Sequence, residues 1–217
     1  MDRASIPKEQ YEKIMECFLD SMMRHGFKGT TMDGIASSLQ MSKRTLYELF
    51  GNKEDLFVEA HKYFHNKNRK QLAKIFSSAS NVMEAIIKCC LHNRDIMSNM
   101  STNFIHDLAE YSTRVNVRPD ETGNTLHKNL YEVLQKGVEE GFFREDINLR
   151  VQCHMFILQM GALKHIEKIF PEEITLLEAY DSISYGFLRG ISTDKGLKEI
   201  EKYLPLPHQP EDASIKP

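Results

Sequence analysis

Apolar residues recur at helical spacing near the N-terminus of the chain and again over most of its length. The first short repeat consists of Met32, Ile35, Ala36 and Leu39, and the second consists of Leu46, Leu49 and Phe50. Residues at this spacing lie on one face of a helix, so each repeat predicts a short amphipathic helix. The dipeptide Gln40-Met41 between them is long enough only for a turn. Two helices joined by so short a turn cross steeply, which is the helix-turn-helix arrangement.

The polar residues around these two helices have the pattern of N-caps and of an exposed tip. Thr31 and Ser42 each precede a helix and supply the hydroxyl group that an N-cap needs. The second helix opens with the polar side chains of Lys43, Arg44, Thr45 and Tyr47, which face away from its apolar residues. Such a tip suits insertion into the major groove of DNA. The alternative is a solvated polar face on a small helical bundle.

The segment as a whole resembles the DNA-binding domain of the TetR (tetracycline-repressor) family of transcriptional regulators. The matching residues are Gly26-Phe27, Thr30-Thr31-Met32, Ile35-Ala36, Met41-Ser42-Lys43, Thr45-Leu46-Tyr47, Phe50 and Lys53-Glu54-Asp55-Leu56. They cover the first quarter of the chain, through the start of a fourth helix. The family usually has a small residue followed by Gly in the turn, where this chain has Leu39-Gln40. Because Gln takes positive φ only at a cost, we expect a strained or differently shaped turn.

The resemblance implies an all-α fold in two parts, and it implies their roles. Residues 1–51 would form a three-helix DNA-binding domain with the helix-turn-helix, and 52–204 a larger helical ligand-binding and dimerisation domain. The tail, 205–217, is rich in Pro and polar residues and is expected to be disordered. The implied function is that of a ligand-responsive regulator, a repressor, which binds a palindromic operator as a homodimer. The expected DNA contacts are Thr31, Ser42, Lys43, Arg44, Thr45, Tyr47 and Lys53.

Helical periodicity continues to the end of the fold, without the sustained alternation that would predict a sheet. A long fourth helix, capped by Asn52, runs to about Phe76 and is the continuous link between the two domains. Lys53 lies in its first turn, where free backbone N–H groups also favour a DNA phosphate. Further helices are expected at about 81–99, 102–115, 120–140, 147–169, 172–191 and 194–203. Gly26 is expected to end the first helix, and the expected boundary residues of the later helices are Asp120, Gly141, Asp146 and Pro171.

The helices expected at 147–169 and 172–191 are apolar on several faces. Such a helix lies either at the centre of a bundle or against another subunit, and spacing alone does not separate the two. In the TetR family the last two long helices pair with their copies in a dimer, and the resemblance therefore favours the second alternative. The expected interface residues are Met155, Leu158, Ala162, Ile166, Leu177, Tyr180, Ile183 and Phe187.

The resemblance also implies a small-molecule effector site in the helical domain, between the fourth helix and the dimer helices. Residues with the mixed polarity of a pocket lining are His92, Met97, Met100, Phe104, His106, Tyr111, His127, Tyr131 and His154. His61 and His65 have a spacing that can hold a metal, but no third ligand is evident and two solvated histidines are the expectation. Adjacent Cys89 and Cys90 project in different directions on a helix, and their role stays open. No metal or cofactor is expected.

Composition narrows the function further. The 217 residues carry a formal net charge of −3, so positive charge for DNA must be concentrated locally. No stretch has the apolar length of a membrane span or signal peptide, and the four cysteines form no framework, so a soluble cytoplasmic protein is expected. An enzyme built on a helical bundle is a competing hypothesis without a recognisable catalytic motif. A helical adaptor that binds protein rather than DNA is the other alternative.

Overall fold

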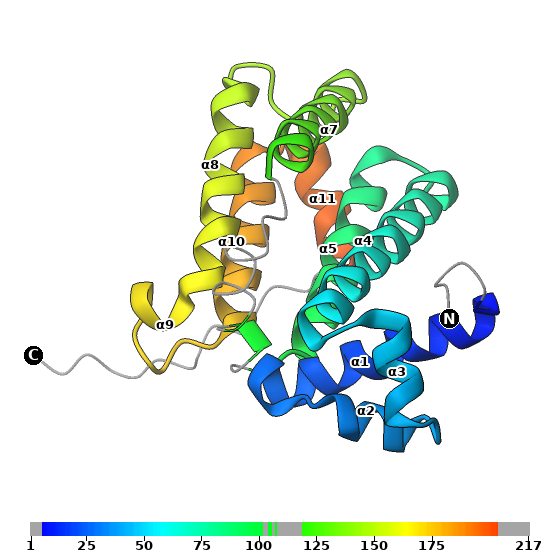
Figure 1. Ribbon diagram of the computed structural model, residues 1–217. Helices are drawn as coiled ribbons and strands as arrows, with labels where there is room; N and C mark the ends of the chain where they lie inside the picture. The colour runs from blue at the N-terminus through cyan, green and yellow to red at the C-terminus, as the bar shows by residue number, and fades with distance from the viewer. Residues whose placement is uncertain (1–5, 102–103, 106, 108–118, 204–217) are drawn as a thin grey trace, which may run out of the picture.

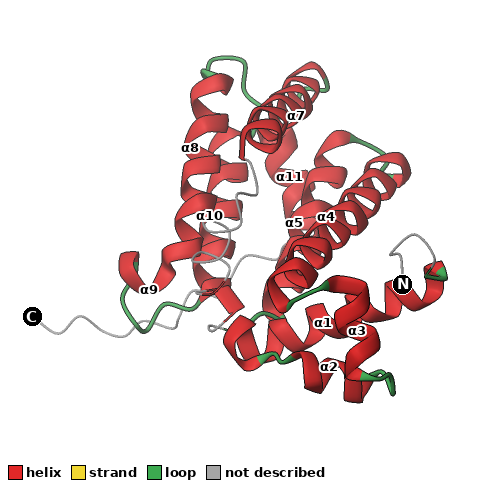
Figure 2. Cartoon of the chain, in the orientation of Figure 1, coloured by secondary structure: helices red, strands yellow, loops and turns green. Residues whose placement is uncertain are grey.

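The computed structural model describes residues 6–101, 104–105, 107 and 119–203. Figures 1 and 2 show that the described elements are helices, with short connections between them. In this described part, β-type pairing is limited to an isolated bridge between Phe143 and Ser192. The all-α prediction is therefore confirmed. No helix among the described residues has the length and apolar character needed to cross a bilayer.

The N-terminal unit is built from α1 (Lys8–Gly29), α2 (Met32–Ser38), α3 (Lys43–Phe50) and the start of α4 (Lys53–Ser78). These helices share one core, in which the side chains of Phe18, Leu46 and Phe50 have no exposed surface. The apolar faces predicted for α2 and α3 both point into this core. In Figure 1 the two short helices lie at the bottom of the view, below α1 and at the far end of the molecule from α7.

Helix α1 is broken before its end. Gly26 has φ 73° and ψ 175°, so regular helix stops there, as predicted, and one more helical turn follows from Phe27 to Gly29. Glycine is suited to this place because positive φ is costly for residues with a side chain. The break turns the chain into the corner between α1 and α2, residues Gly26–Thr31, which is called the α1–α2 corner below.

The turn between α2 and α3 contains the strain that the sequence predicted. Gln40 has φ 53°, and no other described non-glycine residue has a positive φ. A left-handed conformation costs an ordinary residue about 1–2 kcal/mol relative to glycine. The turn nevertheless closes with the Met41 amide donating to the Ala36 carbonyl oxygen at 2.9 Å. The turn therefore has a closing hydrogen bond together with one energetically costly left-handed residue.

The long helix α4 leaves the N-terminal unit and enters the second part of the protein. There it packs along α5 (Val82–Ser98), which also contacts α7 (Pro119–Glu139), α10 (Leu176–Ile191) and α11 (Asp194–Tyr203). Helix α8 (Leu149–Ala162) packs against α7 and α10. A second core, which includes Met83, Leu134 and Phe143, lies among these helices. Figure 1 shows α4 running from the N-terminal unit toward this bundle.

Two predicted helix boundaries were wrong. Asn148, not Asp146, caps α8 by accepting from the Val151 amide at 3.2 Å. Asp146 instead forms a bidentate ion pair with Arg144. Helix α10 begins after Thr175 rather than at Pro171, because Thr175 and Glu178 form a complete capping box there.

The single helix predicted for 147–169 is interrupted. Helix α8 ends at Ala162, a 3₁₀ turn follows over Leu163–His165, and α9 (Ile166–Ile169) is a separate short helix. The interruption directs Leu163 and Ile166 into a third cluster with Ala179 and Tyr180 of α10. Most of the helix predicted at 102–115 and the tail predicted at 205–217 lie outside the described residues.

Candidate nucleic-acid interface

The N-terminal tip of α3 is fixed by a side-chain cap and projects polar groups. Ser42 Oγ accepts from the Thr45 amide at 3.0 Å and lies 2.7 Å from the Thr45 hydroxyl. The next two side chains are exposed, Lys43 by 56% and Arg44 by 88%. Since Leu46, one turn further, is fully buried, the helix presents its polar tip outward while its other face is anchored in the core.

Each cation at this tip has a carboxylate partner. Lys43 Nζ lies 2.7 Å from Asp33 of α2, and this hydrogen bond is the main reason that the pKa of Lys43 is raised. Arg44 Nε lies 2.7 Å from Glu48, one turn along α3. Exposed ion pairs of this kind contribute little to stability, so the cations can exchange partners at low cost. The tip therefore carries two exposed cations, each beside a carboxylate that it can release in exchange for another partner.

Two further predicted contacts flank the tip. Thr31 is exposed, but its hydroxyl oxygen already accepts from the Gly34 amide at 3.1 Å as the cap of α2. Tyr47 is 41% exposed, and Lys43 Nζ lies 6.0 Å from the centroid of its ring. Thr45 is half-buried beside the cap. The structure therefore places Thr31, Ser42, Thr45 and Tyr47 around the two cations on one end of the molecule.

Lys53 has a different environment from the other predicted contacts. Its ammonium group donates to the carbonyl oxygens of Phe27 at 2.9 Å and Thr30 at 3.0 Å. It also lies 4.2 Å from the centroid of the Phe27 ring. Two of its three donors are therefore bound to the α1–α2 corner. For this reason we assign Lys53 to holding the corner and leave it out of the proposed phosphate contacts.

An apolar surface lies on the opposite part of the molecule, along α8. Met155 is 49% exposed and Leu158 69% exposed, as expected for the predicted dimer face. Val151 of α8, and Ile169 and Ile174 beyond it, are also exposed, and the interface prediction omitted them. On neighbouring α10 the exposed positions include Ser182, Gly186 and Gly190. Small residues of this kind let two helices approach closely.

Two residues of the predicted interface, Ile166 and Tyr180, are buried within the protomer. Ile166 is 8% exposed and Tyr180 3% exposed, and the Tyr180 hydroxyl donates to the Cys90 carbonyl oxygen at 2.9 Å. Phe187 is half-buried, and its ring stacks on that of Phe156 with centroids 4.4 Å apart. The half-buried members are Ala162, Leu177, Ile183 and Phe187. Helical spacing did not separate the buried Ile166 from the exposed residues of α8, because the 3₁₀ turn after α8 rotates Ile166 toward the core.

A groove of about 610 Å³ is lined by residues of α1, α4 and α5. Its lining includes Glu16 and Met23 of α1, Phe64 and Asn68 of α4, and His92 and Ile96 of α5. His92 Nε2 lies 2.9 Å from the Asn68 side-chain oxygen. Across the groove, Glu16 accepts from the Tyr63 hydroxyl at 3.0 Å and from Lys67 at 2.6 Å. The groove therefore has one wall in the DNA-binding unit and its other walls in the second part of the protein.

Among the predicted pocket residues, His92 lines this groove, and the other described members are dispersed. Met100 and Phe104 pack on the N-terminal core, and Met97 packs on the third cluster. Tyr131 lies 5.6 Å from the guanidinium of Arg150, and His154 is exposed on α8. His106, Tyr111 and the side chain of His127 lie outside the described residues. Of the described members, His92 alone therefore belongs to the lining of this groove.

The cysteines and histidines singled out in the sequence have buried or paired environments. Burial raises the pKa of Cys89 to about 11 and that of Cys90 to about 12, so both thiols stay protonated and unreactive at neutral pH. His61 Nε2 lies 3.0 Å from His65 Nε2. Burial, with the nearby His65 and Lys164, lowers the pKa of His61 to about 4. In the described part of the chain, no three His, Cys, Asp or Glu side chains form a metal-binding group.

Known proteins resemble this chain in its first part by sequence and in its whole described length by fold. Residues 19–60 match the family model of bacterial regulatory proteins of the tetR family. A TetR-family transcriptional regulator from Agrobacterium tumefaciens is 15% identical with a TM-score of 0.64, over 87% of this chain and 100% of that one. No curated protein matches the chain in sequence.

Two further solved structures have a similar fold. A transcriptional regulator from Cytophaga hutchinsonii is 21% identical with a TM-score of 0.63, over 86% of this chain and 100% of that one. The ketosteroid transcriptional regulator KstR2 of Mycobacterium tuberculosis is 19% identical with a TM-score of 0.58, over 88% and 98% of the two chains. At such identities the likeness shows that the arrangement of helices is shared. It does not show that this chain binds the ligands of these proteins.

Proposed function

We propose that this chain, which belongs to the tetR family of bacterial regulatory proteins, is a ligand-responsive repressor that binds a palindromic DNA operator as a homodimer. The observation that carries the proposal is the tip of α3, where Ser42 caps the helix and Lys43 and Arg44 project from a buried base. A capped helix end with exposed cations fits the major groove of DNA tip first. A regulator of this kind acts in the cytoplasm, where its operator is.

The residues at the tip divide into two roles in this proposal. Arg44, the most exposed cation of the tip, would read base edges together with Lys43 and Thr45. Thr31, Ser42 and Tyr47 would contact the phosphate backbone and set the position of the helix, which carries no sequence information by itself. Since Lys43 and Arg44 are paired with Asp33 and Glu48, binding would exchange these partners for groups on the DNA.

A homodimer would supply the second recognition helix that a palindromic site requires. The proposed contact surface is the exposed apolar stripe of α8, with Val151, Met155 and Leu158, beside the small exposed residues of α10. Several exposed apolar side chains along one helix are typical of a protein interface. Two α8 helices and two α10 helices would then form the contact between protomers.

The effector would act by favouring one orientation of α4, because this helix joins the N-terminal unit to the helical bundle. We place the effector in the second part of the protein, and the groove beside α4 is one place where a small molecule would contact both units. Its effect on DNA affinity is limited by its preference between the two orientations. The ligand's chemistry is not fixed by the groove, whose rim carries both acidic and basic groups.

The test is selection of bound sequences from a random DNA pool by the purified full-length chain. A palindromic consensus with two half-sites is the expected result. An Arg44→Ala variant should weaken binding to that sequence by about 1–3 kcal/mol and relax selection at one base position. Binding that shows no sequence preference, or no binding at low salt, would instead favour the adaptor function.

A further inference from the structure

The α1–α2 corner contains two backbone amides whose partner comes from a distant part of the chain. Gly26 has a non-helical backbone conformation, so the turn that follows it is the first turn of a new helical segment. Amides in a first helical turn have no carbonyl oxygen one turn earlier to bond to. Asp107 supplies the acceptor. Its Oδ2 accepts from the Phe27 amide at 2.5 Å and from the Lys28 amide at 3.3 Å. The carboxylate thus acts as an N-cap contributed from 80 residues away.

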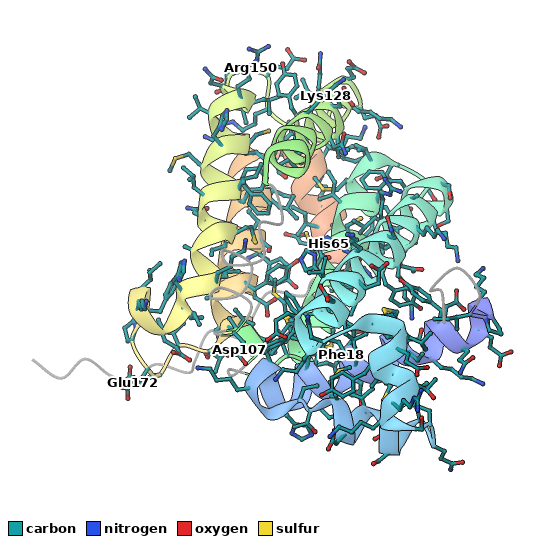
Figure 3. The ribbon with its side chains drawn as sticks, viewed as in Figure 1. Phe18, His65, Asp107, Lys128, Arg150 and Glu172 are labelled. Carbon is teal, nitrogen blue, oxygen red and sulfur yellow. The ribbon has the colours of Figure 1, made fainter. Side chains whose placement is uncertain are left out.

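This contact is enclosed by the protein. Asp107 is 4% exposed and Phe27 1% exposed. Figure 3 shows Asp107 at the junction of α1 with the rest of the molecule. A buried carboxylate that accepts from backbone amides forms a strong, charge-assisted hydrogen bond, and removing it takes this acceptor away from the buried Phe27 amide. Loss of this contact is therefore costly, and the contact holds the corner in the observed arrangement.

Other contacts hold the same corner from α4 and from the chain that follows α5. Lys53 of α4 donates to the carbonyl oxygens of Phe27 and Thr30. Beyond α5, the Ser101 amide donates to the Met23 carbonyl oxygen at 2.8 Å. Phe104 packs into the N-terminal core. The corner leads directly into α2 and α3, so its orientation sets that of the recognition helix.

We infer that Asp107 is the positioning residue through which the helical domain sets the angle of the helix-turn-helix unit. The inference rests on the proposed function, since its consequence is the distance between two recognition helices in a dimer. While Asp107 caps the corner, each unit is held at one angle to its own helical domain. When the cap is released, the unit turns more freely about α4, and the dimer loses its preference for one spacing of half-sites.

The test uses the full-length dimer and three variants. Asp107→Ala removes the acceptor, Asp107→Asn keeps an uncharged one, and Asp146→Ala removes an exposed carboxylate of the helical domain that pairs with Arg144. The first readout needs no DNA: hydrogen exchange of the Phe27 and Lys28 amides should accelerate about tenfold or more in Asp107→Ala, as expected for lost charge-assisted bonds. It should accelerate less in Asp107→Asn and stay unchanged in Asp146→Ala.

The second readout is binding to the selected operator and to versions with the half-sites one base pair closer or further apart. The wild type and Asp146→Ala should discriminate against altered spacing, whereas Asp107→Ala should lose about fivefold or more of that discrimination while its affinity for a single half-site is kept. A variant that merely lost folded protein would bind all sites less and keep its ratio between spacings.

Unchanged exchange of the two amides in Asp107→Ala would overturn the inference. Faster exchange with unchanged discrimination between spacings would overturn the positioning role while the proposed function stands. If the wild type selects no DNA sequence, the proposed function itself fails and the role of Asp107 in spacing fails with it.

Discussion

The ammonium nitrogen of Lys53 lies 2.9 Å from the carbonyl oxygen of Phe27 and 4.2 Å from the centroid of the same residue's ring. The first turn of α4 is thereby attached to the α1–α2 corner by a charged hydrogen bond and a cation–π contact. Lysine at the start of a helix that faces DNA would ordinarily be read as a phosphate ligand. Here its environment assigns the charge to holding the DNA-binding unit together.

Replacing Lys53 with Met tests this assignment, because Met keeps the apolar stem without the charge. We expect the free energy of unfolding to fall by about 1–3 kcal/mol, since carbonyl oxygens of the corner lose a charged donor. The logarithmic salt dependence of operator binding should stay unchanged, whereas loss of a phosphate contact lowers that slope by about one. Denaturant unfolding and salt titrations of binding measure the two effects.

Lys43→Met is the matched control for Lys53→Met. Lys43 is 56% exposed at the tip of α3, so its loss should change the free energy of unfolding by less than about 0.5 kcal/mol. The same change should lower the salt slope of binding. If Lys53→Met lowered the salt slope and left the free energy of unfolding unchanged, Lys53 would be a phosphate contact after all.

Glu48 is predicted to restrain DNA binding through its ion pair with Arg44. The guanidinium is 88% exposed and lies 2.7 Å from the Glu48 carboxylate, which also repels phosphates. Glu48→Gln should therefore raise affinity for operator and for unrelated DNA severalfold at low salt and steepen the salt dependence. Fluorescence anisotropy over a salt series measures both.

Glu9→Gln serves as the control for Glu48→Gln, because Glu9 has a similar exposed pair with Lys13 on α1. It should leave DNA affinity unchanged. Weaker operator binding by Glu48→Gln, with altered preference at one base pair, would show instead that Glu48 accepts from a cytosine amino group.

The sequence predicted the helix-turn-helix in detail because its signals are local. The caps at Thr31 and Ser42, the apolar spacing and Gly26 act within one or two turns of the chain. The strained or differently shaped turn at Gln40 was expected from the resemblance, because this chain lacks the family's glycine there, and the φ of 53° confirms the strained alternative. By contrast, the partners of Lys53 and Asp107 are set by tertiary packing across 26 and 80 residues, which no local pattern contains.

The helical domain was harder to predict, because its helices are apolar on more than one face. Spacing showed that Ile166 and Leu158 lie on apolar stripes, and only the bend after α8 separates the buried side chain from the exposed one. The start of α10 was misplaced because Pro171 and the Thr175–Glu178 capping box are both good helix starts, and the box prevailed. Pocket residues had no local signal beyond mixed polarity.

Acid should destabilise the protein partly through His61. Its folded pKa of about 4 lies below the ordinary value of about 6.5, so below pH 6.5 the unfolded chain takes up a proton that the folded chain does not. The free energy of unfolding should therefore be independent of this group above about pH 7 and fall as the pH is lowered from about 6.5 to about 4. His65, whose pKa is also lowered by burial, adds to the effect in the same direction.

His61→Gln should flatten the pH dependence of the melting temperature between about pH 6.5 and pH 4, and His61→Gln with His65→Gln should flatten it further. His25, which is exposed on α1, gives the control, and His25→Gln should leave the profile unchanged. A profile in His61→Gln that coincides with the wild type would mean that the histidine is protonated in the folded protein at mildly acidic pH.

Gly186 offers a test of the dimer face that separates assembly from folding. It lies at an exposed position of α10, and a Cβ atom at this glycine would have no neighbouring atom within 4 Å in the protomer. Gly186→Gln should therefore stabilise the isolated chain by up to about 1 kcal/mol, because glycine is unfavourable within a helix. In the proposed dimer the same side chain would project into the contact between protomers, so sedimentation velocity should show a shift from dimer to monomer. Ala73→Gln, on the exposed side of α4, should leave the dimer intact. As dimerisation is lost in Gly186→Gln, the affinity for an operator with two half-sites should fall. If this variant still dimerised fully, α10 would be excluded from the interface.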